Sequence, residues 1–473
     1  MTSDDAVRVY YQNVMAGADA VGAEHGLTDE QLDGLAGRIG KIVKQIEEGR
    51  ARGERRYREL PYDESLIQAV EAACAVRRGK YDNLVVLGIG GSALGNIALH
   101  TALNSPMYNL LPNAQRRGPR LFVMDNVDPV QFGALLDLLD DELDRTCFNV
   151  VSQSGETAET VSQFIIVRDR LRRRMGACGV RDRILVTTNP QAGAMRQIVK
   201  EEGYDSLPVP DGVGGRFSVL SPVGLFSAAM CGVDVRRLLA GAAAMDLRVR
   251  NPQLRQNPAA LLAAVHHLLT QRGKSLHVMM PYSYQLKDLA DWYRQLWAES
   301  LGKRKSLDQR EVFAGATPIR ALGATDQHSQ IQLYREGPND KVITMLAVEQ
   351  FERDVPIPSG FDDVDALSYL GDKSLGRLLD AERQATEQAL LVSQRPVLTV
   401  VFARVCEETV GQFIYLYECA TSIMGLLMNV NAYDQPAVEL GKQYTFALMG
   451  RAGYEQQARE LQAKTQTKRA CQV

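Results

Sequence analysis

The chain has 473 residues, of which 45% are hydrophobic and 23% are charged. These proportions are typical of a globular protein and exclude a mainly disordered chain, and the length favours two or three domains. The 54 basic and 57 acidic residues leave a net charge of −3. Because a nearly neutral chain has no overall field to hold a polyanion, we expect no nucleic-acid partner.

Membrane and metal sites are also not expected. No stretch reaches the ~20 apolar residues that cross a bilayer, and the acidic N-terminus lacks the basic-then-apolar pattern of a signal peptide. The seven cysteines form no CxxC pair, which favours a reducing cytoplasm over a disulfide framework. No HExxH motif occurs, and the adjacent His266 and His267 point to different sides of a predicted helix.

Residues 27–49 place apolar side chains at intervals of three and four, and residues 1–65 are predicted as a helical N-terminal extension. Short apolar runs then alternate with helical stretches. The predicted strands fall in two sets: 84–87, 121–124, 148–151 and 184–186, then 276–280, 342–348 and 397–402. Continuous apolar strands between amphipathic helices are typical of parallel sheets covered on both faces. The predicted fold is α/β, with two doubly wound parallel-sheet domains in tandem.

The polar stretch 249–258, with two prolines and no apolar run, separates the two sets of strands. We therefore predict a first α/β domain over residues 66–250 and a second over 251–425. A helical C-terminal segment is predicted over 426–473, where the residues after Tyr454 are rich in Gln, Lys and Arg.

The first motif, LVVLGIGGSALGN at 84–96, runs from a buried strand into Gly90, Gly91, Ser92 and a helix. Glycines let the backbone approach a ligand closely, and amides at a helix start favour an anion or a polar oxygen. The pattern also resembles a dinucleotide-binding GxGxxA, with Asp125 ending the next strand. A glycine turn that only permits close packing is the alternative interpretation.

The second motif, FNVVSQSGETAETVSQF at 148–164, ends a buried strand in a cluster of hydroxyls. Ser152, Ser154 and Thr157 directly precede a helix, where free amides add to the hydroxyl donors. This pattern favours phosphate binding. Helix capping by Ser154 or Thr157 is the alternative, although one cap needs only one hydroxyl. Without GK[ST], the motif does not support a triphosphate P-loop.

Two further motifs supply an arginine and a carboxylate. GVGGRFSVLSPVGL at 212–225 places Arg216 after three glycines, as suits a group that stabilises an enolate-like charge. On the predicted helix 286–303, Trp292, Gln295 and Glu299 share one face. A nearby Trp can desolvate a carboxylate and favour its action as a general base. Surface ion pairs, of Arg216 with a carboxylate or of Glu299 with Lys303, are the alternatives.

The last two motifs are less specific. GATDQHSQIQ at 323–332 contains His328 in a polar turn, and NAYDQPAVELGKQY at 431–444 contains Lys442. A structural histidine and a solvated lysine are the alternatives.

Taken in chain order, the six motifs resemble those of the phosphoglucose isomerase family, which is built from two sugar-isomerase (SIS), flavodoxin-like domains. GIGGS, SxSxET, GGRFS, QLWAESLGK, the QH of GATDQHSQ and VELGK occur in the family's order, and the resemblance spans residues 60–450. One departure is Gln153, where some members carry a lysine in the phosphate loop.

The resemblance implies reversible isomerisation of glucose 6-phosphate and fructose 6-phosphate in glycolysis and gluconeogenesis, without metal or cofactor. It implies a phosphate site at Ser152, Gln153, Ser154 and Thr157, and a sugar site at Gly91, Ser92 and Gln295. Glu299 would move a proton through a cis-enediol, and Arg216 would stabilise its charge. His328 and Lys442 would assist ring opening, with His328 supplied by the partner subunit of a homodimer.

Two other classes of function stay open at this level. A nicotinamide dehydrogenase would use GIGGSA and Asp125, and a sugar-phosphate sensor would use the phosphate loop without Glu299, His328 and Lys442. A glutamine-dependent amino-sugar synthase needs a cysteine near the N-terminus, whereas the first one here is Cys74.

Overall fold

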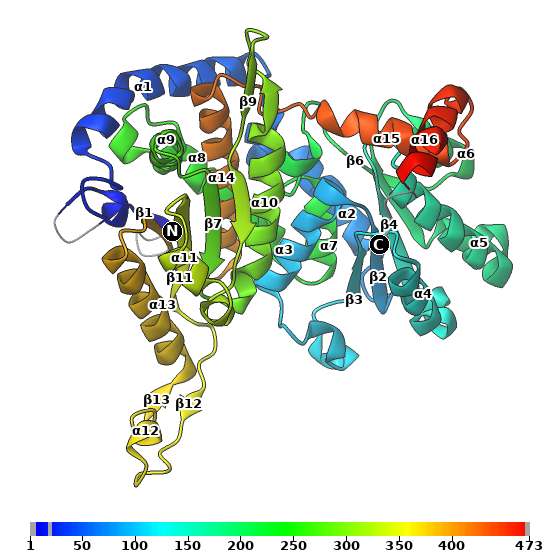
Figure 1. Ribbon diagram of the computed structural model, residues 1–473. Helices are drawn as coiled ribbons and strands as arrows, with labels where there is room; N and C mark the ends of the chain where they lie inside the picture. Colours follow the sequence, from blue (N-terminus) through cyan, green and yellow to red (C-terminus); the bar gives the residue numbers. More distant parts are fainter. Residues whose placement is uncertain (1–5, 18–20, 469–473) are drawn as a thin grey trace.

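The computed structural model describes residues 6–17 and 21–468; the first five residues and Cys471 lie outside the described residues. Two five-stranded sheets stand side by side with helices packed between and around them (Figure 1). All seven predicted strands are confirmed, as is the doubly wound α/β fold class.

The first sheet is entirely parallel and has the order β3-β2-β4-β5-β6. Its strands are β2 (Asn83–Leu87), β3 (Arg120–Met124), β4 (Thr146–Val151), β5 (Ile184–Thr188) and β6 (Asp205–Pro208). The strand order reverses between β2 and β4, as in flavodoxin-like sheets. Such a switch point opens a crevice at the carboxyl ends of the two strands, where ligands bind.

The second sheet repeats this plan, with the order β1-β14-β11-β7-β10. Its parallel strands are β7 (Leu276–Pro281), β10 (Thr317–Arg320), β11 (Lys341–Gln350) and β14 (Val397–Arg404). The N-terminal β1 (Arg8–Tyr10) pairs antiparallel with β14 at the edge. The sequence did not predict β1, β6 or β10, because each is short and only partly buried and so lacks a continuous apolar run.

The helices of the N-terminal region and first sheet are α1 (Asp29–Ala51), α2 (Glu64–Ala75), α3 (Leu94–Leu103), α4 (Pro129–Leu138), α5 (Ala158–Arg181), α6 (Ala194–Glu202), α7 (Pro222–Met230) and α8 (Val235–Val249). Those that follow are α9 (Pro258–Gln271), α10 (Lys287–Leu301), α11 (Ile331–Glu336), α12 (Asp365–Ser368), α13 (Leu375–Val392), α14 (Glu407–Leu427), α15 (Ala437–Leu448) and α16 (Glu455–Lys468). The predicted helix at 27–49 corresponds to α1, and a Thr28–Gln31 capping box begins it.

Helix α14 forms the centre of the molecule and packs along α8 and α9. Among the described residues it alone is long and apolar enough to cross a membrane, but 94% of its apolar window is buried inside the protein. It is therefore a buried core helix. A helix that is buried on all sides is apolar all round, which accounts for its high hydropathy.

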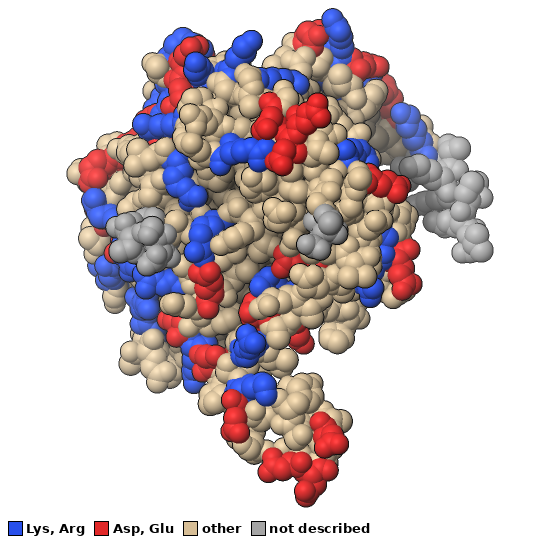
Figure 2. All heavy atoms as spheres, turned by 90° about the vertical axis from the view of Figure 1, so that its left-hand side faces the viewer, with Lys and Arg blue, Asp and Glu red and all other residues tan. Residues whose placement is uncertain are grey.

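Two short hairpins extend from this body. One pairs β8 (Lys303–Lys305) with β9 (Glu311–Ala314) directly after α10. The other pairs β12 (Pro356–Ile357) with β13 (Lys373–Ser374) and projects with α12 as an arm (Figure 1). Figure 2 shows basic and acidic side chains intermixed over one face of the body, and acidic side chains gathered on the arm.

Candidate active site

The glycine motif lies at the switch point of the first sheet. It follows β2 and forms the 3-10 turn η4 (Gly90–Ser92), while the hydroxyl motif follows the neighbouring β4. A Cβ on Gly91 would lie 2.3 Å from the carbonyl carbon of Gly215, so only glycine permits this contact between the two loops. Gly90 has a φ of +57° and faces the Gln295 amide. The glycines therefore have a packing role, whatever else they contact.

Glu299 and Arg216 meet beside these glycines. Glu299 lies in the last turns of α10, and Arg216 lies in η8 (Gly215–Phe217). Glu299 Oε1 is 3.6 Å from a terminal nitrogen of Arg216, and its Oε2 accepts a hydrogen bond of 3.1 Å from Gln295 Nε2. The Arg216 side chain is 2% exposed and that of Glu299 is 26% exposed. The carboxylate is thus oriented on both sides but still reachable.

Arg216 is fixed by acceptors that no motif in the sequence predicted. Its Nε donates to Ser300 Oγ at 2.7 Å, and its terminal nitrogens donate to Gln435 Oε1 and to the carbonyls of Ala432 and Asp434. Burial lowers the pKa of Arg216, an effect that Glu299 and Asp434 oppose. An arginine stays charged under such a shift, so a permanent cation faces Glu299.

Lys303 links the end of α10 to Asp434, which also accepts a hydrogen bond from Arg216. Its Nζ donates to the main-chain carbonyl of Glu299 at 2.6 Å and to that of Asp434 at 2.9 Å. The alternative of a surface pair between the Lys303 ammonium and the Glu299 carboxylate is therefore not what the structure shows. The sequence carried a signal for this contact. Lys303 follows Glu299 by four residues at the end of α10, where a basic side chain can donate to the last carbonyls of the helix.

The Trp292 ring has a different neighbour from the one expected. It is buried, and its ring centre lies 6.4 Å from that of Phe413 in the core, whereas the Glu299 carboxylate contacts Gln295 and Arg216. The spacing of four correctly placed Gln295 beside Glu299, but Trp292, about two turns before Glu299, belongs to the aromatic core.

The hydroxyl motif forms a tight loop before α5. Ser152 is buried and its Oγ accepts from the Gly155 amide at 3.0 Å, with Thr157 Oγ1 3.4 Å away. Ser154 Oγ accepts from the Glu156 amide at 3.2 Å. Thr157 occupies the N-cap position, yet its side chain makes no capping hydrogen bond, so capping does not account for its hydroxyl. Gln153 is exposed.

Among the described residues, Glu299 contacts Gln295, Arg216 and Lys303, and neither His328 nor Lys442 forms a hydrogen bond or ion pair with it. His328 is exposed at the end of η11 (Thr325–His328), beyond the carboxyl end of β10. Lys442 lies on α15, 52% exposed, and pairs with Glu439 at 2.7 Å. The segment from Ala432 to Gln435 that Arg216 and Lys303 hold leads directly into this helix.

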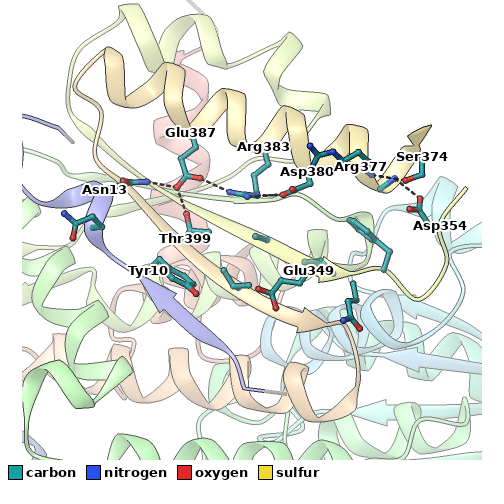
Figure 3. Close-up of a pocket in the computed structure, with 17 residues that line it drawn as sticks. Tyr10, Asn13, Glu349, Asp354, Ser374, Arg377, Asp380, Arg383, Glu387 and Thr399 are labelled. Carbon is teal, nitrogen blue, oxygen red and sulfur yellow. Dashed lines mark hydrogen bonds and ion pairs between the residues drawn. The ribbon is translucent and has the colours of Figure 1, made fainter. Parts of the chain in front are cut away.

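A cavity of about 1030 Å³ lies elsewhere, between α13, β1, β11 and β14 (Figure 3). Its charged groups are largely satisfied by one another: Arg383 pairs with Asp380 and Glu387, and Glu387 also accepts from Asn13 and Thr399. It contains none of the predicted site residues. Within residues 6–17 and 21–468, no group of three His, Cys, Asp or Glu side chains could hold a metal ion.

Comparisons with known proteins agree with the motifs. The family model for phosphoglucose isomerase matches residues 64–467. A glucose-6-phosphate isomerase of Carboxydothermus hydrogenoformans is 45% identical over 92% of this chain and 93% of its own length. One from Rubrobacter xylanophilus is 43% identical, over 91% and 96%.

Solved structures share the fold. A hypothetical protein of Thermus thermophilus has a TM-score of 0.79 and 35% identity, over 90% of this chain and 97% of that one. A glucose-6-phosphate isomerase of Chlamydia trachomatis has a TM-score of 0.80 and 21% identity, over 98% and 92%. The family match and the identity to curated relatives extend over most of the sequence, and the chain belongs to the phosphoglucose isomerase family.

Proposed function

We propose that this protein catalyses the reversible isomerisation of glucose 6-phosphate and fructose 6-phosphate. It is an aldose–ketose isomerase by family membership. The observation that carries the proposal is the pairing of Glu299 with the buried Arg216 at 3.6 Å, beside the glycine turn at the switch point of the first sheet. Neither a nicotinamide dehydrogenase nor a sensor requires this pair.

In the proposed mechanism, Glu299 carries a proton between the first two carbons of the open sugar. One base must reach both carbons from a single face of a planar cis-enediol, and a carboxylate on a rigid helix meets that demand. Arg216 stabilises the negative charge that develops on the enediolate oxygen, since its position is set by hydrogen bonds before substrate arrives. Gln295 orients the carboxylate and the sugar hydroxyls.

The phosphate is held at a distance from this chemistry. Ser152, Gln153, Ser154 and Thr157 surround it, with the free amides at the start of α5 contributing further donors. Gly91 and Ser92 line the sugar. Binding the remote phosphate positions the reacting carbons at Glu299, so this binding energy serves orientation.

Ring opening is assigned to His328 and Lys442, through proton transfer at the ring oxygen and the first hydroxyl. We propose that the active protein is a homodimer in which the partner's surface brings His328 to this chain's Glu299. The exposed position of His328 on a short turn supports this arrangement. The proposed setting is the cytoplasm, in glycolysis and gluconeogenesis, without metal or organic cofactor.

A coupled assay of the purified protein with fructose 6-phosphate, with and without chelator, tests the proposal. Formation of glucose 6-phosphate at equal rates in both is expected. Binding of the sugar phosphate without turnover would indicate a sensor, and a change in nicotinamide absorbance without coupling enzyme would indicate a dehydrogenase. Loss of activity on chelation would contradict the metal-free mechanism.

A further inference from the structure

The proposed phosphate loop carries a charge of the wrong sign. In the sequence Ser152 to Thr157, the only ionisable side chain is Glu156. A carboxylate beside a phosphate dianion repels it, and Gln153 offers no cation in compensation. The hydroxyls and the amides at the start of α5 supply donors but no full positive charge, so a cation from another part of the chain would strengthen binding of a dianion.

The structure places Arg451 against this carboxylate. Two terminal nitrogens of Arg451 lie 3.2 and 3.3 Å from the same oxygen, Glu156 Oε2, although the two residues are 295 positions apart in the sequence. Arg451 belongs to the turn between α15 and α16 (Figure 1), so the contact joins this turn to the loop that precedes α5. A guanidinium has five donor hydrogens, so this contact leaves donors for a second acceptor.

Arg451 is also held in place from its own side. Its guanidinium lies 4.4 Å from the centre of the Phe446 ring, and its amide donates to the Phe446 carbonyl at 2.9 Å. Phe446 in turn packs edge-on against Tyr454, with ring centres 5.7 Å apart. Stacking on a ring limits the rotamers of the arginine.

We propose that Arg451 is a substrate-binding residue: it cancels the charge of Glu156 and serves as the counter-charge for the phosphate of the sugar. This inference rests on the proposed function. The phosphate dianion and Glu156 compete for the same guanidinium, so Glu156 weakens phosphate binding while Arg451 strengthens it. The same contact fixes the turn after α15, the helix that carries Lys442.

Because Arg451 is proposed to strengthen phosphate binding and Glu156 to weaken it, substitutions at the two positions should change phosphate affinity in opposite directions. With inorganic phosphate as the probe, Arg451→Gln should raise the inhibition constant about tenfold or more, the range for a lost hydrogen bond to a charged group. The Michaelis constant for fructose 6-phosphate should rise with it, and kcat should stay within a few-fold. Glu156→Gln should lower both constants. Arg459→Gln, an equal charge change on the exposed face of α16, is the matched control and should alter neither.

Three results would overturn the proposal. Unchanged phosphate affinity in Arg451→Gln is one, and weaker phosphate binding in Glu156→Gln is another. A fall in kcat without any change in phosphate affinity is the third, because it would show that the contact only anchors the C-terminal segment. Phosphate binding measured by calorimetry keeps the test independent of turnover, so a wild-type protein that does not isomerise would remove the proposed function without deciding this inference.

Discussion

The proposed catalytic residues stand in two contrasting surroundings. Arg216 is 2% exposed, donates to four acceptors and faces a carboxylate on the long helix α10. His328 and Lys442 are exposed, the first on a four-residue turn and the second on a helix whose side chains are mostly in solvent. The groups proposed for proton transfer between carbons are thus assembled within one chain, whereas those proposed for ring opening lie exposed on its surface.

Removing the proposed base, Glu299, from the cluster around the buried Arg216 should reduce the isomerisation rate more than any other change predicted here. Glu299→Gln keeps the shape and the hydrogen bond with Gln295 but cannot take a proton. We expect near-complete loss of isomerisation, with the affinity for a sugar-phosphate analogue kept within about tenfold, or ~1.4 kcal/mol. The coupled assay and inhibition by the analogue measure the two quantities.

Solvent exchange sharpens the same prediction. Because the Glu299 side chain is 26% exposed, its proton can exchange with water before it returns to carbon. In deuterated water the wild type should place deuterium at the second carbon of glucose 6-phosphate, and Glu299→Gln should not. Exchange and turnover in the variant above a few per cent of wild type would assign the proton transfer to another residue.

Mixing two inactive variants tests the second half of the contrast. If His328 acts across a subunit boundary, a dimer of His328→Ala with Glu299→Gln contains one complete site and one that lacks both groups. Random assortment of equal amounts should restore about a quarter of the wild-type activity. Heterodimers that form, as mass spectrometry would show, but stay inactive would mean that each site is built from one chain.

The phosphate loop should give a smaller effect, on binding rather than on chemistry. Ser152→Ala with Thr157→Ala removes two hydroxyl donors that the phosphate retains in both ground and transition states. Each lost hydrogen bond to the dianion should cost ~1.5–3 kcal/mol, seen as a raised Michaelis constant with a similar kcat. An unchanged inhibition constant for inorganic phosphate would contradict the loop assignment.

The sequence predicted the interior of the fold better than its edges. Every strand with a continuous apolar run was found, while β1 and β10, half exposed at the edges of the second sheet, carry no such run. In the site, spacing along one helix placed Gln295 beside Glu299 correctly. The contacts of Arg216 with Ala432 and Gln435 join residues more than 200 positions apart, and no local pattern in one sequence encodes such a contact.

The core that supports α10 contains two other histidines, which extend the contrast between buried and exposed groups. The rings of His266 and His277 stack with centres 4.4 Å apart, and both pack against Trp297 of α10. Neither ring nitrogen of His266 has a hydrogen-bond partner among the described residues. Burial lowers the pKa of His266 to about 3, so the folded protein keeps this ring neutral where an unfolded chain would protonate it.

The sign of the pH dependence follows from this difference. Above the unfolded pKa of about 6.5 neither state binds the proton, and below it the unfolded state binds more protons than the folded state, so the free energy of unfolding falls with falling pH until about pH 3. One such group lowers the free energy of unfolding by about 2 kcal/mol between pH 7 and pH 5.

His266→Phe keeps an aromatic ring against His277 and Trp297 and removes the titrating group. In urea unfolding at fixed protein concentration, the variant should match the wild type near pH 8 and exceed its stability by about 2 kcal/mol at pH 5. Parallel losses of stability in the two proteins would show that His266 does not titrate on unfolding.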